Sequence, residues 1–276
     1  MNFDQFNLDS RLRAGITRAG YDAPTPIQTA ALPPALAGHD VIGTAQTGTG
    51  KTAVFVLAIL QKLLGTTRGK TRALIITPTR ELAEQINDTI RELGRDTKIR
   101  SATIYGGVGA APQIKALRDG VDILVACPGR LLDHIEQRHA NLSGIEILVL
   151  DEADRMFDMG FLPSVRRILK LLPTRRQTML FSATFPSEVE QLAAQVLNHP
   201  QRIALGLSRP VHTVTHAIFP VTQHLKTALL LALLKQTDTE SVLIFTRTKH
   251  RAQRLAEQIS RASHNVTSLH SNRTQG

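Results

Sequence analysis

The stretch Ile147-Leu148-Val149-Leu150-Asp151-Glu152-Ala153-Asp154 places two adjacent carboxylates directly after four apolar residues. A continuous apolar run of this length is typical of a buried strand in a parallel sheet. Two carboxylates at the end of such a strand are costly unless a cation lies beside them. Upstream, Ala45-Gln46-Thr47-Gly48-Thr49-Gly50-Lys51-Thr52 supplies a glycine-rich turn that ends in a lysine and a threonine. Backbone N–H groups of such a turn bind phosphates, the lysine adds an ammonium group, and the hydroxyl suits Mg²⁺. The two stretches together predict a nucleoside triphosphate site.

The rest of the chain alternates short apolar runs with helical patterns. The predicted strands are Val41–Thr44, Ala73–Thr77, Ala102–Tyr105, Ile123–Ala126, Ile147–Leu150, Thr178–Ser182 and Arg202–Leu205. The clearest predicted helices are Thr52–Leu64, Arg80–Leu93, Pro112–Leu117, Leu162–Leu172 and Ser187–Leu197. This alternation predicts an α/β fold, in which a parallel sheet is covered by helices on both faces. Ligands of such sheets bind at the carboxyl ends of the strands, where both motifs fall.

A second, smaller unit is expected after the sheet. The segment Gly206–Pro210 has the composition of a linker, and strand and helix patterns restart beyond it. Strands are predicted at Ala217–Val221, Val242–Thr246 and Thr267–Leu269, with helices at Gln223–Leu234 and Lys249–Ser260. We predict domain 1 over residues 1–207, a linker over 208–214 and a partial domain 2 over 215–276, which has too few elements to close a core of the same kind.

Composition limits the class of protein. The 276 residues contain 33 Lys and Arg against 23 Asp and Glu, a net charge of +10. This excess favours a polyanionic partner, although a basic surface that only serves solubility explains it equally well. With two Tyr and no Trp, base stacking is not the expected binding mode, so backbone recognition is predicted. The single cysteine, Cys127, indicates a reducing compartment. The short apolar runs predict a soluble cytoplasmic protein with no membrane association.

Taken in order, the motifs resemble those of the DEAD-box ATP-dependent RNA helicases, in the manner of the bacterial RhlE-type branch. The Ala-x-Thr-Gly-x-Gly-Lys-Thr turn and Asp-Glu-Ala-Asp are two of them, and residues 4–32 resemble the adenine-reading Q motif. Further matches are Pro78-Thr79-Arg80, Gly106-Gly107, Pro128-Gly129-Arg130 and Ser182-Ala183-Thr184. The resemblance implies a P-loop NTPase fold with a RecA-like first domain followed by an incomplete second RecA-like domain.

The resemblance also implies residue roles. ATP would be bound by Phe6, Tyr21, Gln28, Ala45, Gln46, Thr47, Gly48, Thr49, Gly50, Lys51 and Thr52. Catalysis would depend on Lys51, Asp151 and Glu152, with Mg²⁺ held by Thr52 and Asp151. Hydrolysis would be coupled to unwinding through Asp154, Ser182 and Thr184. RNA would be bound through its backbone by Pro78, Thr79, Arg80, Gly106, Gly107, Pro128, Gly129 and Arg130. Proteins of ribosome assembly or RNA degradation are the implied partners.

Each role has a simpler alternative. Phe6 could pack a short helix against the domain, the two arginines could form surface ion pairs, and the acidic tandem or Ser182 and Thr184 could cap helices. Cys127 stands where the family has threonine, and a plain buried cysteine is its expected state. The family's later second-domain motifs have no counterpart before Gly276, so the chain is expected to be truncated within that domain, to hydrolyse ATP slowly and not to unwind RNA. A non-catalytic ATP- and RNA-binding fragment is the main alternative, and a P-loop small-molecule kinase a weaker one.

Overall fold

The computed structural model describes residues 2–46, 48–65, 69–204, 215–236 and 240–270. Thr47 and the linker predicted over residues 208–214 lie outside the described residues. The chain divides into two compact units, Met1–Arg209 and Pro210–Gly276, which are described one at a time.

The first unit is built on a seven-stranded sheet in the order β3-β4-β2-β5-β6-β1-β7, and all of its paired strands are parallel. The strands are β1 (Val41–Thr44), β2 (Ala73–Ile76), β3 (Ser101–Ile104), β4 (Ile123–Ala126), β5 (Ile147–Leu150), β6 (Gln177–Ser182) and β7 (Gln201–Ala204). Each of the seven strands predicted for this unit is present, with its ends shifted by one residue at most. The predicted α/β class with a parallel sheet is therefore confirmed.

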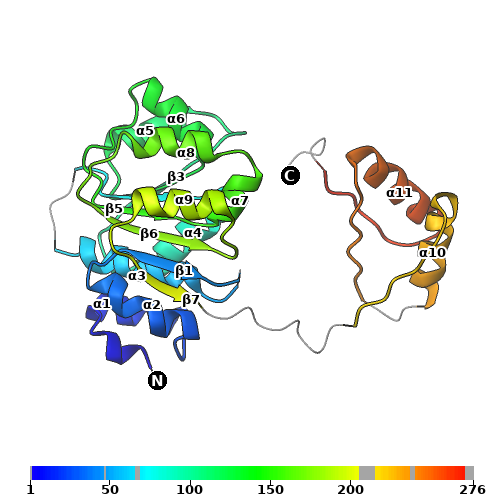
Figure 1. The fold of residues 1–276 in the computed structure, drawn as a ribbon, viewed down its shortest axis with the longest axis horizontal. Coiled ribbons are helices and arrows are strands. Elements are labelled where there is room, and N and C mark those ends of the chain that lie inside the picture. The colour runs from blue at the N-terminus through cyan, green and yellow to red at the C-terminus, as the bar shows by residue number, and fades with distance from the viewer. Residues whose placement is uncertain (1, 47, 66–68, 205–214, 237–239, 271–276) are drawn as a thin grey trace. The chain divides into compact units, whose positions relative to one another are not determined.

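Helices cover both faces of this sheet (Figure 1). They are α1 (Ser10–Arg18), α2 (Pro26–Leu36), α3 (Lys51–Leu63), α4 (Arg80–Leu93), α5 (Ala111–Asp119), α6 (Pro128–Glu136), α7 (Ala153–Asp158), α8 (Leu162–Leu169) and α9 (Ser187–Val196), preceded by the 3₁₀ helix η1 (Phe3–Phe6). Alternate strand residues point to opposite faces. Val149 accordingly joins the core under α1–α4, whereas Leu148 and Leu150 join the core under α6–α9. A strand buried on both faces has to be apolar at every position, which explains the runs in the sequence.

The second unit contains η2 (Gln223–Leu225), α10 (Lys226–Gln236) and α11 (Lys249–Arg261). No strand forms within residues 215–236 and 240–270, so the strands predicted at Ala217–Val221, Val242–Thr246 and Thr267–Leu269 are wrong for this part of the chain. Most of the large apolar side chains of those segments are exposed, with Leu243 80% and Phe245 87% exposed. A strand needs a neighbouring strand for its backbone hydrogen bonds and a core for its side chains, and these segments have neither.

Across the described ranges, every helix is too short or too polar to cross a bilayer.

Candidate functional site

The carboxyl edge of the sheet brings the predicted nucleotide residues together. The strands β5, β6 and β1 are neighbours in the sheet, and they end before Asp151, at Ser182 and before Ala45. The backbone N–H of Ala45 donates to the Ser182 carbonyl at 3.2 Å, which extends the β1–β6 pairing by one residue. Parallel strands deliver their last residues to one edge, so positions far apart in the sequence meet here.

The glycine-rich turn leads from β1 into α3 through two left-handed residues. Gly48 has φ +83° and Gly50 has φ +92°, conformations that glycine adopts without a steric cost. A Cβ on Gly50 would also lie 2.5 Å from Nε2 of Gln28. The Thr49 hydroxyl donates to the Gln46 carbonyl at 2.8 Å and closes the turn. The following helix, α3, begins at Lys51, so its N-terminal N–H groups and the positive end of its dipole face the same place as the turn.

Lys51 and Asp151 are buried beside each other at this edge. The Lys51 ammonium donates to the Ala45 carbonyl at 2.8 Å, and 6% of the residue is exposed. Burial raises the pKa of Asp151 to about 6, while the charge of Lys51 opposes the rise and that of Glu152 adds to it. Lys51 is therefore close enough to Asp151 for its charge to lower the pKa of that carboxyl. Both residues lie at the carboxyl edge of the sheet, where the sequence predicts the nucleotide site.

Glu152 occupies an unusual backbone position next to that pair. Its φ of +51° is left-handed, a conformation that costs a non-glycine residue free energy and is concentrated at functional sites. Its side chain makes no capping hydrogen bond to α7, and its carboxylate lies 3.3 Å from Nη1 of Arg155. The capping alternative therefore does not explain Glu152.

Asp154, Ser182 and Thr184 form a hydrogen-bonded cluster one turn further on. Both the backbone N–H and the hydroxyl of Thr184 donate to Oδ2 of Asp154 at 2.8 Å, and the Asp154 N–H donates to the Ser182 hydroxyl at 3.0 Å. Burial alone would raise the pKa of Asp154, but hydrogen bonds from Thr184 and Ser182 outweigh it and hold that pKa below its ordinary value. The structure therefore brings together the three residues to which the resemblance assigns the coupling role.

The N-terminal segment contacts the glycine-rich turn through Gln28. Its amide Nε2 donates to the Gly50 carbonyl at 3.1 Å, and its Oε1 accepts the Thr25 N–H at 2.9 Å. Phe6 is half-buried in η1 and packs edge-on to Phe3, whose ring stacks on Tyr21 at 6.2 Å. The packing alternative for Phe6 is thus what the described structure contains. Phe3 was missed by the sequence reasoning, although an aromatic three residues before Phe6 was a visible signal.

The three segments predicted to contact RNA follow β2, β3 and β4, which are also neighbours in the sheet. Thr79 caps α4 by accepting the Leu82 N–H at 3.3 Å, Gly107 has φ +81°, and α6 begins at Pro128. The guanidinium group of Arg80 lies over the Tyr105 ring, 4.9 Å from its centroid. Arg130 donates hydrogen bonds to two backbone carbonyls, those of Tyr105 and Val108, which makes a plain surface ion pair a poor description of it.

Two further residues singled out in the sequence are Thr52 and Cys127. Thr52 lies half-buried in the first turn of α3. Cys127 precedes α6, and burial, with a contribution from Glu81, raises the pKa of its thiol to about 11. A thiol with so high a pKa is a poor nucleophile at neutral pH, as expected, although Cys127 is half-buried and not fully buried.

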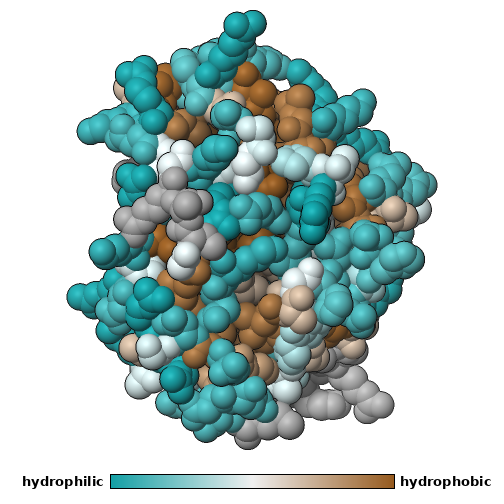
Figure 2. Space-filling view, turned by 90° about the vertical axis from the view of Figure 1, so that its left-hand side faces the viewer, coloured by the Kyte–Doolittle hydropathy of each residue, from teal (hydrophilic) through white to brown (hydrophobic). Residues whose placement is uncertain are grey.

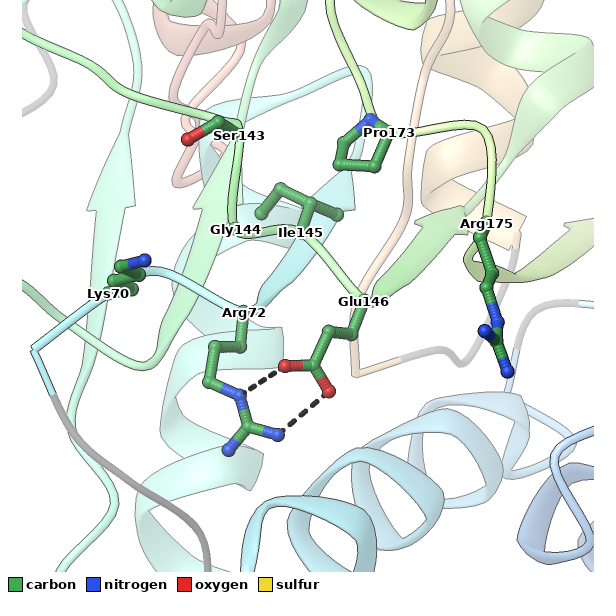
Figure 3. A pocket seen from close by; sticks show the side chains of 8 residues that line it. All are labelled: Lys70, Arg72, Ser143, Gly144, Ile145, Glu146, Pro173 and Arg175. Atoms are coloured by element: carbon green, nitrogen blue, oxygen red, sulfur yellow. Dashed lines mark hydrogen bonds and ion pairs between the residues drawn. The ribbon is translucent and has the colours of Figure 1, made fainter.

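The opposite, amino edge of the sheet contains a different hollow. The face in Figure 2 is dominated by hydrophilic side chains. A cavity of about 440 Å³ there is lined by residues that precede β2, β5 and β6 (Figure 3): Lys70, Arg72, Ser143, Gly144, Ile145, Glu146, Pro173 and Arg175. Its central guanidinium, that of Arg72, is neutralised by Glu146 through hydrogen bonds of 2.7 and 2.8 Å. A cavity whose deepest cation already has a carboxylate partner is a poor phosphate site, so the carboxyl edge is the better candidate.

Comparison with known proteins identifies the family to which the chain is similar. The DEAD/DEAH box helicase family model matches residues 25–192, more than half of the chain. The chain is 41% identical over 281 residues to DEAD-box ATP-dependent RNA helicase 30 of Arabidopsis thaliana, covering 99% of this chain and 47% of that protein. It is 41% identical over 273 residues to ATP-dependent RNA helicase RhlB of Pasteurella multocida (96% and 64%) and 37% identical over 276 residues to DEAD-box ATP-dependent RNA helicase CshA of Bacillus subtilis (100% and 56%).

The chain spans about half the length of the curated relatives it matches. The narrower likeness to the RhlE-type branch stays a prediction, since the relatives named above carry other names. The family itself follows from the ordered motifs, their meeting at one sheet edge and the family match. The chain belongs to the DEAD/DEAH box helicase family.

Proposed function

We propose that this chain is the ATP- and RNA-binding part of an ATP-dependent RNA helicase. The observation that carries the proposal is the buried meeting of Lys51 with Asp151, at the mouth of a glycine-rich turn and the N-terminus of α3. A buried carboxylate, a buried ammonium and a phosphate-binding turn at one edge suit a triphosphate better than any uncharged ligand.

In this proposal Lys51 contacts the β- and γ-phosphates, and Glu152 orients the attacking water or accepts its proton. The adenine would lie near Gln28, Phe6 and Tyr21. The two amide atoms of Gln28 are engaged by Thr25 and Gly50, so binding of a base either adds to these hydrogen bonds or replaces one of them.

Mg²⁺ suits the donor set at this edge. Magnesium is usually held by one or two carboxylates together with substrate phosphates, and Asp151 is a buried carboxylate whose pKa is raised to about 6. Asp151 and the Thr52 hydroxyl would hold the ion, which would supply positive charge to the phosphates. The buried Asp151 would in turn gain a cation that favours its ionised form.

RNA is proposed to run along the loops after β2, β3 and β4. The Gly106-Gly107 turn, and Gly129 in the first turn of α6, offer backbone N–H groups without bulky side chains, which suits phosphates rather than bases. The +10 net charge supports the same class of partner. The proposed protein partners belong to ribosome assembly or RNA degradation. The proposed location is the cytoplasm, which suits a single free cysteine.

A second candidate function is ATP and RNA binding without turnover. It is favoured by the second unit, whose described residues form helices but no strand and leave Phe245 and Leu269 exposed. Strand separation needs a second folded domain to close over the ligands. We therefore expect this 276-residue chain to bind both ligands, to release phosphate slowly and not to separate a duplex.

Binding of a fluorescent ATP analogue with Mg²⁺ and RNA-stimulated phosphate release test these proposals together. The Lys51→Gln variant should weaken nucleotide binding by roughly tenfold or more, because a buried charge-assisted contact is lost. The Glu152→Gln variant should retain nucleotide binding and reduce any phosphate release by roughly a hundredfold. Lys62→Gln, at the other end of α3, is the matched control. Equal nucleotide affinity of the Lys51 and Lys62 variants would refute the site, and robust duplex separation would refute the expected deficiency.

A further inference from the structure

Tyr105, at the start of the loop after β3, contacts three helices through its carbonyl, its ring and its hydroxyl. The carbonyl of Tyr105 accepts hydrogen bonds from Nε2 of Gln113 on α5 at 3.0 Å and from Nε of Arg130 on α6 at 3.3 Å. The Tyr105 ring lies under Arg80 of α4, and its hydroxyl donates to Glu84 of the same helix. One residue thus joins α4, α5 and α6. Two of these helices begin with segments proposed to contact RNA.

Arg130 holds both sides of the Gly106-Gly107 pair. Its Nε donates to the carbonyl of Tyr105, directly before the two glycines, and its Nη2 donates to the carbonyl of Val108, directly after them, at 3.0 Å. Gly107 is left-handed at φ +81°. A Cβ added at either glycine would have no neighbouring atom within 4 Å, so the two residues do not pack against the protein. The conformation of this turn therefore depends on the contacts of its two neighbours.

Behind the turn, Gln113 is held in one orientation by a buried chain of hydrogen bonds. Gln113 and His134 are 6% and 1% exposed, and Oε1 of Gln113 lies 3.3 Å from Nε2 of His134. With the amide turned over, Oε1 would face the Tyr105 carbonyl, acceptor against acceptor. The observed orientation requires the proton of His134 to be on Nε2, and its Nδ1 faces Nδ1 of His139 at 3.5 Å.

Burial also favours the uncharged form of this histidine. Burial lowers the pKa of His134, the charges of Arg130 and His139 lower it further, and Asp133 opposes them. A neutral imidazole with its proton on Nε2 is the form that can donate to Gln113 and keep the amide N–H aimed at Tyr105.

We propose that Tyr105, Gln113 and His134 are positioning residues, which fix the Gly106-Gly107 turn against the first turns of α4 and α6 so that the three segments can grip one RNA backbone. The inference rests on the proposed RNA binding by these segments. None of the three residues needs to touch RNA in this arrangement. Their effect is on affinity for RNA and not for nucleotide, because the ATP residues lie on other strands.

The test compares two buried glutamines in the complete 276-residue chain. Gln113→Met keeps size and removes both hydrogen bonds. Gln177→Met is the matched control, because Gln177 is 4% exposed and its amide donates to the carbonyls of Ala35 and His39 at the amino edge. Fluorescence anisotropy with a labelled single-stranded oligouridine reports RNA affinity, a fluorescent ATP analogue reports nucleotide affinity, and thermal unfolding reports stability.

Gln113→Met should weaken RNA binding roughly three- to tenfold and leave nucleotide affinity within about twofold. Both variants should lower the melting temperature by a similar amount, since each loses two buried hydrogen bonds. Gln177→Met, however, should leave RNA affinity within about twofold. Tyr105→Phe removes the hydroxyl and with it the contact to Glu84, and should weaken RNA binding by roughly threefold. This variant keeps the proposal testable if Gln113→Met does not fold.

Failure of the positioning role and failure of the proposed function give different results. If the unaltered chain binds the oligouridine and neither Gln113→Met nor Tyr105→Phe changes that affinity, the positioning role is overturned. The same holds if Gln177→Met weakens RNA binding as much as Gln113→Met, since the effect is then general destabilisation. If the unaltered chain binds no RNA, the proposed function itself fails, and the inference with it.

Discussion

Asp151 and Asp154 lie three positions apart, and their surroundings shift their pKa values in opposite directions. Burial beside Glu152 raises the pKa of Asp151 to about 6, and the charge of Lys51 compensates only in part. Asp154 is also disfavoured by burial, but hydrogen bonds from Thr184 and Ser182 hold its pKa below the ordinary value. At neutral pH the ionised Asp154 therefore raises the free energy of unfolding, whereas the ionised Asp151 lowers it. Destabilised charge of this kind is typical of a residue that binds a cation or reacts.

The Asp151→Asn variant should be more stable than the unaltered chain at pH 8 in the absence of ligands. Since the folded-state pKa of about 6 lies above the ordinary 3.8, the folded chain keeps this proton to higher pH than the unfolded chain. Ionisation of Asp151 then lowers the free energy of unfolding as the pH rises through that window, by up to about 3 kcal/mol. Urea unfolding at pH 4 and pH 8 measures this.

The stability advantage of Asp151→Asn should be small at pH 4 and largest at pH 8, and binding of the ATP analogue with Mg²⁺ should be weaker. A variant no more stable than the unaltered chain at pH 8 would mean that the charged form of Asp151 is not strained. Thr184→Val is an opposite control: it removes the hydroxyl contact to Asp154, so it should destabilise the chain at pH 8 and progressively less as Asp154 becomes protonated.

At the scale of elements, helix α1 packs through a close backbone contact that no periodic pattern in the sequence reveals. Helix α1 was not predicted, although Asp9 caps it through the Arg11 N–H at 2.9 Å. It approaches the end of α4 at Gly15, where a Cβ would lie 2.3 Å from the carbonyl oxygen of Leu93. The glycine allows the two helix backbones to approach closely, and a single glycine in a helical pattern gives no sign of this from sequence.

Gly15→Ala should destabilise the packing of α1 against α4 despite the better helix propensity of alanine. The clash is with backbone, which cannot move aside as a side chain can, so a loss of about 1–3 kcal/mol is expected. Gly109→Ala is the control, because no atom lies within 4 Å of its Cβ and its φ is not left-handed. Urea unfolding gives the size of the loss, and hydrogen exchange of the α1 amides locates it. Equal stability of the two variants would contradict the close approach.

At the scale of the whole molecule, the site depends on one unit alone. Every described residue assigned to ATP, Mg²⁺ or RNA belongs to the unit Met1–Arg209, whose two apolar cores lie on either side of one parallel sheet. The second unit contributes helices α10 and α11 and has Ile259 as its buried apolar residue within the described ranges. Its other described apolar side chains are half-buried or exposed, so we expect its stability to be low.

A chain consisting of residues 1–209 should therefore fold and bind nucleotide without the second unit. We expect a single cooperative thermal transition and affinity for the ATP analogue within about twofold of that of the 276-residue chain. Calorimetry and fluorescence titration measure the two quantities. Failure of residues 1–209 to fold, or a tenfold loss of nucleotide affinity, would show that the second unit supports the first.

Amino-acid sequence alone determined the parallel sheet, the family and the edge at which the site forms. Strands buried on both faces must be apolar throughout, and the motifs had to stand at their carboxyl ends, so Val149 and Lys51 could be placed without coordinates. Tertiary structure alone decided the strand order, the raised pKa of Asp151, the internal engagement of Arg130 and Gln28, and the failure of the predicted strands around Phe245. These features depend on which distant groups come into contact, and neither periodicity nor composition specifies a partner across the fold.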